Sequence, residues 1–167
     1  MNISDRGIEW LKTQEGRVMR DGRHVVYDDA TGRPVTHGAP LPPGATIGYG
    51  HLIKPGQDFS AGITDAAATA LLRDDVAAAQ RAVCASITVP LTQPQYDALV
   101  ALAYNIGGAA FRGSTVVRYI NDPKFKSSQY PTLESAWHAW AKCRGKILPG
   151  LINRRRAEWK LYSTGVY

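Results

Sequence analysis

Two carboxylate positions near the start of the chain suit general acid-base chemistry. Glu15 precedes Gly16 at the end of a segment with helical spacing, and Asp29 lies in the run Tyr27-Asp28-Asp29. Two carboxyl groups across a cleft cleave glycosidic bonds, because one protonates the leaving oxygen while the other activates water or attacks the sugar. The negative end of the helix macrodipole favours the protonated form of a Glu at a helix C-terminus, and a general acid requires that form.

The same residues also have ordinary structural interpretations. A Glu near a helix end is usually a solvated surface residue, and two Asp before a glycine are typical of a turn. Thr46 alone is typical of a strand. Successive side chains of a strand point to opposite faces, so only one of Asp28 and Asp29 faces a cleft. The pattern Tyr27-x-Asp29 favours Asp29.

The chain contains no motif for several other common kinds of chemistry. Gly48-Tyr49-Gly50 begins like a dinucleotide fingerprint, but Ile53 occupies the place of the third glycine. There is no GK[ST] phosphate loop, HExxH or GxSxG. The four histidines lack metal-ligand spacing with the cysteines or with one another. We therefore expect no metal site and no cofactor.

Length and composition limit the classes of fold that the chain can adopt. The 167 residues fit one domain, and 44% hydrophobic with 20% charged residues is typical of a globular protein. Cys84 and Cys143 have no CxxC spacing and give little reason to expect a disulfide. Residues 1–16 contain charged side chains throughout and form no signal peptide, and no window is apolar enough to span a membrane.

The positive charge gathers in one segment. The net charge is +6, and the residues from Lys142 to Lys160 hold seven basic side chains against Glu158 alone. Such a segment favours a polyanionic partner, whether nucleic acid, anionic lipid or an acidic wall polymer. Arg154, Arg155 and Arg156 either attract that partner or pack against the core and pair with Glu158.

The pattern along the chain predicts an α+β fold. Helical spacing predicts helices over residues 4–14, from 65 through Val83, and from Thr92, with Gln95 in a capping box, to 106. Shorter helices are expected over 114–121, 132–142 and 151–161. Glycines and prolines between residues 17 and 51 indicate a small sheet with long loops. We expect one domain, 1–167, with a β-rich lobe at about 16–60 and a helical lobe of 1–15 and 61–167.

Several runs together resemble the phage-type lysozymes, glycoside hydrolase family 24. They are Glu15-Gly16, Tyr27-Asp28-Asp29-Ala30-Thr31-Gly32, Thr46-Ile47-Gly48-Tyr49-Gly50-His51-Leu52, residues 91–107, Gly113-Ser114-Thr115, Gly145 to Leu151 and Asn153 to Glu158. The resemblance covers nearly the whole chain in order. It implies a lysozyme-like fold with a cleft between the two lobes.

The resemblance implies an endolysin, a muramidase that cuts the β-1,4 bond between N-acetylmuramic acid and N-acetylglucosamine in peptidoglycan. Glu15 becomes the proton donor, Asp29 the opposing carboxylate, and Thr46 a hydroxyl that helps to hold the attacking water. His51 is interpreted as a buried, hydrogen-bonded structural residue. The implied substrate-binding positions are Leu52, Tyr104, Asn105, Ser114 and His138.

The implied setting is a bacterial host. The protein is expected as a monomer in the host cytoplasm, released to the wall through a holin-type membrane lesion, with peptidoglycan as partner and no nucleic acid. The basic C-terminal region is a candidate contact for the anionic outer-membrane surface. A lytic transglycosylase and a non-catalytic polyanion- or peptidoglycan-binding module stay as alternatives, and inverting or retaining stereochemistry stays open.

The chain departs from the family pattern at two insertions. Asp21-Gly22-Arg23 suggests an added hairpin, and a long stretch separates Gly32 from Thr46. Loops of such length in a compact domain tend to be functional. We expect the second insertion to wall one end of the sugar cleft.

Overall fold

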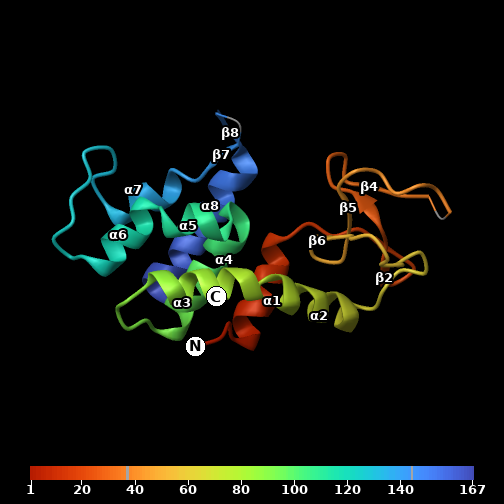
Figure 1. Ribbon diagram of the computed structural model, residues 1–167, viewed down its shortest axis with the longest axis horizontal. Helices are drawn as coiled ribbons and strands as arrows, with labels where there is room; N and C mark the ends of the chain where they lie inside the picture. The colour runs from red at the N-terminus through yellow and green to blue at the C-terminus, as the bar shows by residue number, and fades with distance from the viewer. Residues whose placement is uncertain (37, 144) are drawn as a thin grey trace. The chain divides into compact units, whose positions relative to one another are not determined.

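The structure is a computed structural model that describes residues 1–36, 38–143 and 145–167 (Figure 1). His37, one of the four histidines, and Arg144, in the basic segment, lie outside the described residues. The chain divides into two compact units. We call Ile8–Asp75 the N-terminal unit, and Val76–Tyr167 together with Met1–Gly7 the C-terminal unit. Helices and small antiparallel sheets confirm the predicted α+β class; the single-domain organisation stays a prediction.

The first helix, α1 (Asp5–Gln14), forms where the sequence predicts it. Ser4 caps the helix, because the Gly7 N–H donates to Ser4 Oγ at 2.9 Å. Leu11 is fully buried. The Glu15 N–H donates to the Leu11 carbonyl at 3.2 Å. Glu15 therefore stands directly after the last helical residue.

The predicted added hairpin is present in the N-terminal unit. Strands β1 (Met19–Arg20) and β2 (Arg23–His24) pair antiparallel. The two residues between them, Asp21 and Gly22, have φ values of 51° and 74°. Positive φ at both central positions is the requirement of a type I′ turn, which explains why Asp-Gly stands there.

A four-stranded antiparallel sheet follows in the order β4-β3-β5-β6. Its strands are β3 (Tyr27–Asp28), β4 (Arg33–Pro34), β5 (Ala45–Ile47) and β6 (His51–Leu52). The register places Tyr27 opposite Thr46. Apolar side chains pack around this sheet: Val26, Ala45 and Ile47 are buried, and Val35, Ile53, Phe59, Ile63 and Leu71 pack against them.

The C-terminal unit is built on α4 (Gln93–Ile106), where residues 96–103 are all buried. The predicted capping box between Thr92 and Gln95 is present at its start. α4 packs against α3, α5 and α8 (Figure 1). The remaining helices are α2 (Asp65–Asp75), α3 (Ala77–Ser86), α5 (Gly108–Arg112), α6 (Thr115–Asn121), α7 (Leu133–His138) and α8 (Pro149–Thr164). Among the described residues, no helix combines the length and apolar character needed to cross a membrane.

Three predicted boundaries are wrong. The helix expected from residue 65 through Val83 breaks at Val76, which is fully buried and continues the apolar stripe, so the pattern does not reveal the break. The helix expected over 132–142 ends at His138. The chain then forms a hairpin of β7 (Lys142–Cys143) and β8 (Lys146–Ile147).

The third error concerns the start of the last helix. The helix expected to begin at residue 151 begins two residues earlier, because Pro149 and Gly150 form the first turn of α8. Proline suits that position because the first N–H groups of a helix have no partner within the helix. The sequence also gives no prediction of α5, which is five residues long.

Candidate active site

Tyr27 connects the segment after α1 to strand β3. Its hydroxyl donates to the Gly16 carbonyl at 3.5 Å, and the residue is buried. Burial raises the pKa of the Tyr27 phenol, and the negative charges of Asp29 and Glu15 raise it further. The hydrogen bond from Tyr27 joins the residue after Glu15 to the strand that precedes Asp29.

The neighbouring Asp28 has a different surrounding. Its carboxylate accepts from the Ala30 N–H at 2.9 Å and from Thr31 Oγ1 at 3.0 Å. This is an Asx turn, a local structure that Asp forms with its own backbone. Asp28 is therefore occupied by the turn, whereas Asp29 is exposed. The role of Asp29 opposite Glu15 stays a prediction.

Thr46 is held in the sheet next to Tyr27. It is 3% exposed, and its Oγ1 donates to the Gly44 carbonyl at 2.8 Å. A hydroxyl has one hydrogen to donate and two lone pairs to accept with. With its hydrogen given to Gly44, the Thr46 hydroxyl acts toward any further partner as an acceptor.

Glu15 lines a cleft of about 500 Å³ in the N-terminal unit. The cleft has a mixed polar wall, formed by Glu9, Lys12, Thr13, Glu15, Arg17, Tyr49 and Asp65. The lining contains two cationic side chains and three carboxylates, so positive and negative charges nearly balance there.

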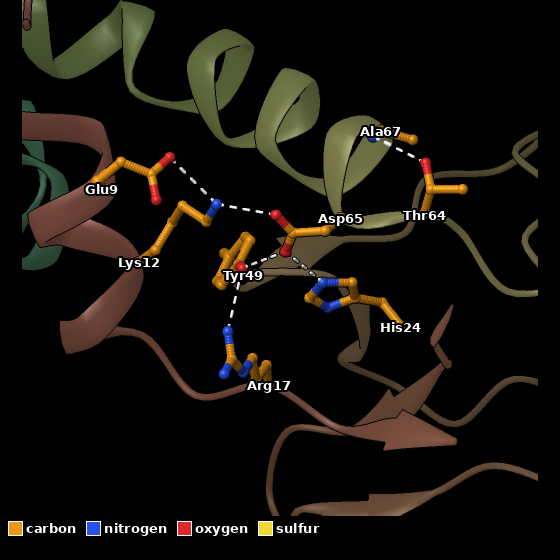
Figure 2. A network of polar contacts seen from close by, with 8 residues as sticks. All are labelled: Glu9, Lys12, Arg17, His24, Tyr49, Thr64, Asp65 and Ala67. Carbon is orange, nitrogen blue, oxygen red and sulfur yellow. Dashed lines mark hydrogen bonds and ion pairs between the residues drawn. The ribbon is translucent and has the colours of Figure 1, made fainter. Parts of the chain in front are cut away.

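Sequence reasoning missed the network around Asp65 on this wall (Figure 2). The Asp65 carboxylate accepts from Lys12 Nζ at 2.9 Å and from the Tyr49 hydroxyl, and contacts His24 Nε2 at 3.1 Å. The hydrogen bond from Tyr49, followed by those from Lys12 and His24, holds the pKa of Asp65 well below its ordinary value. Asp65 is the first residue of α2, a position at which the helix dipole favours an acidic side chain. The sequence does not reveal which side chains contact it.

The network extends to Arg17, two residues after Glu15. Arg17 donates from a terminal guanidinium nitrogen to the Tyr49 hydroxyl at 3.2 Å, and its guanidinium lies over the Tyr49 ring at 5.9 Å (Figure 2). Lys12 lies over the same ring at 5.2 Å. Tyr49 therefore ties both cations of the cleft wall to Asp65.

His51 is structural, as predicted. It is 6% exposed. Its Nδ1 lies 2.9 Å from Asp75 Oδ2, and its Nε2 lies 3.2 Å from Gln57 Oε1. Both ring nitrogens are thus engaged within the N-terminal unit.

The predicted substrate-binding residues lie in both units. Leu52 is in the N-terminal unit and is 55% exposed. In the C-terminal unit Asn105 is exposed, Tyr104 and His138 are half-buried, and Ser114 is buried. Ser114 caps α6, because its Oγ accepts from the Val117 N–H at 3.2 Å. Their contact with a substrate stays a prediction.

The structure decides between the two interpretations of the arginines in α8. Arg154 and Arg155 are buried, and Glu158 accepts from both, at 3.1 Å and 2.7 Å. They therefore pair with Glu158 inside the C-terminal unit. Arg156 and Lys160 are exposed and form the part of the basic segment in α8 that faces solvent.

The second insertion lines a pocket of about 470 Å³ in the N-terminal unit. Its lining includes Pro34, Val35, Thr36 and Leu41 of the insertion, together with residues 57–62. Glu15, Asp29 and Thr46 do not line this pocket. The expected role of the insertion as a wall of the sugar cleft stays a prediction.

Cys84 carries a free thiol and is exposed. Its Sγ lies 3.4 Å from the Tyr96 hydroxyl.

Comparison with known proteins identifies relatives along the whole chain. The Phage lysozyme family model matches residues 22–158. The endolysin of Salmonella phage P22 is 36% identical over 165 residues, which cover 97% of this chain and 98% of that protein. The endolysin of Bacillus phage PZA is 36% identical over 99% of this chain. The chain spans 56% of the length of the PZA endolysin.

A solved structure supports the fold. The muramidase domain of SpmX from Asticaccaulis excentricus superposes with a TM-score of 0.72 at 32% identity. The superposition covers 98% of each chain. This chain is therefore similar to a muramidase domain in both sequence and backbone, which confirms the lysozyme-like fold.

Proposed function

The chain belongs to the phage lysozyme family, and from this premise we propose that it is an endolysin muramidase that hydrolyses the β-1,4 bond between N-acetylmuramic acid and N-acetylglucosamine. One observation carries the proposal: Glu15 lines the cleft of the N-terminal unit, and the hydrogen bond from Tyr27 to Gly16 joins its segment to the strand that precedes Asp29. Two carboxyl groups held near one another are the minimum that glycoside hydrolysis requires.

Glu15 is the general acid in this proposal. It follows the last residue of α1, where the helix dipole presents its negative end. It also lines the cleft of the N-terminal unit, so a substrate oxygen has access to it. Glu15 donates its proton to the glycosidic oxygen as the bond to the anomeric carbon breaks.

Asp29 and Thr46 position the attacking water. Asp29 accepts a hydrogen bond from that water and takes its proton as the oxygen attacks, while Thr46 accepts the second hydrogen bond because its own hydrogen is given to Gly44. The water oxygen then keeps a lone pair for the anomeric carbon, on the face opposite the leaving sugar. This division of roles favours inversion of configuration.

The setting follows from the family. We infer that peptidoglycan is the substrate, and that a holin-type lesion gives the protein access to the wall from the host cytoplasm. The exposed Arg156 and Lys160, with Lys142 and Lys146 of the β7-β8 hairpin, are the candidate contacts for an anionic envelope surface. The monomeric state stays a prediction.

Mass analysis of muropeptides released from purified peptidoglycan tests the proposal. A muramidase yields reducing-end muramic acid that has gained one water. Anhydromuramic ends would instead assign the lytic transglycosylase alternative. If folded protein bound peptidoglycan without cleaving it, the non-catalytic binding alternative would hold. Nuclear magnetic resonance of the first product anomer distinguishes inversion from retention.

A further inference from the structure

We propose that Arg17 binds a carboxylate of the glycan substrate, and that Tyr49 is a positioning residue that holds the Arg17 guanidinium in the cleft of the N-terminal unit. Arg17, Tyr49 and Glu15 all line this cleft of about 500 Å³. All three belong to the N-terminal unit. The inference rests on the proposed function, because it names a charged substrate group that the same cleft binds.

The two cations of the cleft wall differ in their partners. Lys12 Nζ pairs with Glu9 Oε1 at 3.2 Å and with Asp65 Oδ2 at 2.9 Å, and its side chain is 11% exposed. Arg17 is exposed, and its guanidinium contacts the side chain of Tyr49. In the part of the chain that the structure describes, Arg17 pairs with no carboxylate. A carboxylate from a ligand would therefore supply the partner that this cation lacks.

The contact with Tyr49 leaves the best carboxylate-binding edge of Arg17 open. Nη1 donates to the Tyr49 hydroxyl at 3.2 Å (Figure 2). Nε and Nη2 lie on the other edge of the planar guanidinium, and neither donates a hydrogen bond within the described residues. Two parallel N–H groups on one edge match the two oxygens of a carboxylate. Arg17 thus presents a two-donor site to a ligand in the cleft.

Tyr49 holds the opposite side of this guanidinium. Its side chain is 2% exposed, and its hydroxyl donates to Asp65 Oδ1. A phenol has one hydrogen to donate, so the Tyr49 oxygen faces Arg17 as an acceptor. Burial raises the pKa of the Tyr49 phenol, and the hydrogen bond to Asp65 raises it further, so the phenol keeps its hydrogen at neutral pH. Asp65 and Tyr49 therefore fix one nitrogen of Arg17.

The surrounding charges permit an anion to approach Arg17. Glu9 and Asp65 share the ammonium group of Lys12, which offsets their repulsion of a second anion. Peptidoglycan supplies a matching carboxylate, because its stem peptides carry free carboxylates and muramic acid carries a lactyl carboxylate wherever the peptide has been removed. A glycan of neutral N-acetyl sugars has neither group. Arg17 therefore selects muramic acid-containing glycan over a neutral one.

Kinetics of Arg17 variants on purified peptidoglycan test the binding role. Arg17→Met should raise KM about 3- to 30-fold with kcat within about twofold, as for the loss of a charge-assisted hydrogen bond that precedes the chemical step. Arg17→Lys should fall between the two, because it keeps the charge and loses the fork. Arg81→Met removes an equal charge from the exposed Arg81 in α3 and should leave KM unchanged. A wild-type KM for Arg17→Met would overturn the binding role.

A double-mutant cycle tests the positioning role of Tyr49. Tyr49→Phe keeps the buried ring and removes the hydroxyl that accepts from Arg17. We expect KM to rise about 2- to 5-fold, with no further rise when Tyr49→Phe is added to Arg17→Met. A purely structural role would instead give effects of Tyr49→Phe that are the same in both backgrounds. That additive result would overturn the positioning role.

Modified substrates test the carboxylate itself. Carbodiimide-driven amidation of peptidoglycan neutralises its carboxylates, and on this substrate Arg17→Met should have the same KM as the wild type. A KM difference that persists there would overturn the carboxylate as the ligand.

An amidase that strips the stem peptides identifies the source of the carboxylate. Loss of the Arg17→Met effect on the stripped glycan would assign a stem-peptide carboxylate, whereas its retention would assign the lactyl carboxylate. Absence of turnover by the wild type would count against the proposed function. Turnover with equal KM values for the wild type and Arg17→Met would count against this inference alone.

Discussion

The two units differ in whether they bury any carboxylate. Both buried carboxylates in the described part of the chain, Asp97 and Glu158, lie in the C-terminal unit and are 1% and 0% exposed. Asp97 accepts from Gln93 at 2.8 Å and from the Tyr167 hydroxyl at 2.6 Å, as well as from Ser4. Buried charges require such partners, because burial removes the water that would solvate them.

The N-terminal unit keeps its carboxylates within reach of solvent. Asp29 is exposed, Glu15 is half-buried, and the Asp65 side chain is 53% exposed although three side chains hold it. The difference indicates that a buried carboxylate satisfied by protein donors has a structural role, whether the donors are neutral, as at Asp97, or cationic, as at Glu158. Candidates for proton transfer are carboxylates that a substrate oxygen can reach, and Glu15 meets this condition because it lines the cleft of the N-terminal unit.

The largest effect is expected from the pair of adjacent aspartates. Asp29→Asn should lower kcat/KM on peptidoglycan about 10²- to 10⁴-fold, since a neutral amide cannot take the proton of the attacking water. Asp28→Asn should leave kcat/KM within a few fold, because Asp28 serves the turn of residues 28–32. Rates measured side by side at equal folded concentration decide this. The reverse order would exchange the roles assigned to the two residues.

The next effect concerns the buried network. Glu158→Ala leaves Arg154 and Arg155 without their buried partner and should lower the free energy of unfolding by about 3–5 kcal/mol. Urea denaturation followed by circular dichroism measures the loss. A loss below about 1 kcal/mol would mean that water solvates these arginines and that the cluster is not a buried network.

The matching change in the N-terminal unit should cost less. Asp65→Asn removes a charge that solvent already screens, so we expect about 1 kcal/mol at neutral pH. Because the pKa of Asp65 is depressed, its contribution is complete above the ordinary value of 3.8 and is lost as pH falls through the depressed value. Denaturation at pH 7 and pH 2 should therefore show a wild-type advantage that shrinks in acid. An advantage that grows in acid would contradict the assigned network.

The smallest effect is expected at the surface of α8. Reversing the charges of Arg156 and Lys160 to Glu should weaken binding to purified cell walls about threefold or less at physiological salt and reduce its salt dependence. Exposed charges are screened, unlike the buried Arg155. Co-sedimentation across a salt series measures this. Unchanged binding and unchanged salt dependence would show that Arg156 and Lys160 do not contribute to wall binding.

Much of the fold was predictable because local signals agreed with it. Some residue types predict the local backbone conformation by themselves. Examples are the helix cap Ser4, the capping box at Thr92 and the Asp21-Gly22 turn. The break at Val76 was not predictable, because a buried valine continues an apolar stripe whether or not the helix does. The β7-β8 hairpin depends on pairing between segments that lack a strong strand pattern.

In the candidate site, too, some residues were predictable from the sequence and others were not. Glu15, Asp29 and Thr46 were predicted from residue type and family resemblance, whereas the partners of Asp65 were not. His24, Tyr49 and Lys12 are far apart in sequence and meet only through tertiary packing. The burial of Arg155 was likewise invisible, since a run of three arginines has the same sequence pattern whether its charges face water or Glu158.

The kinetics of Glu15→Gln test the central claim most directly. The substitution removes the transferable proton and nearly preserves the shape of the side chain. We predict a loss of about 10²- to 10⁴-fold in the rate of muropeptide release, with unfolding free energy and wall binding close to those of the wild type. Release at the wild-type rate by a folded Glu15→Gln variant would contradict the assignment of Glu15 as the general acid.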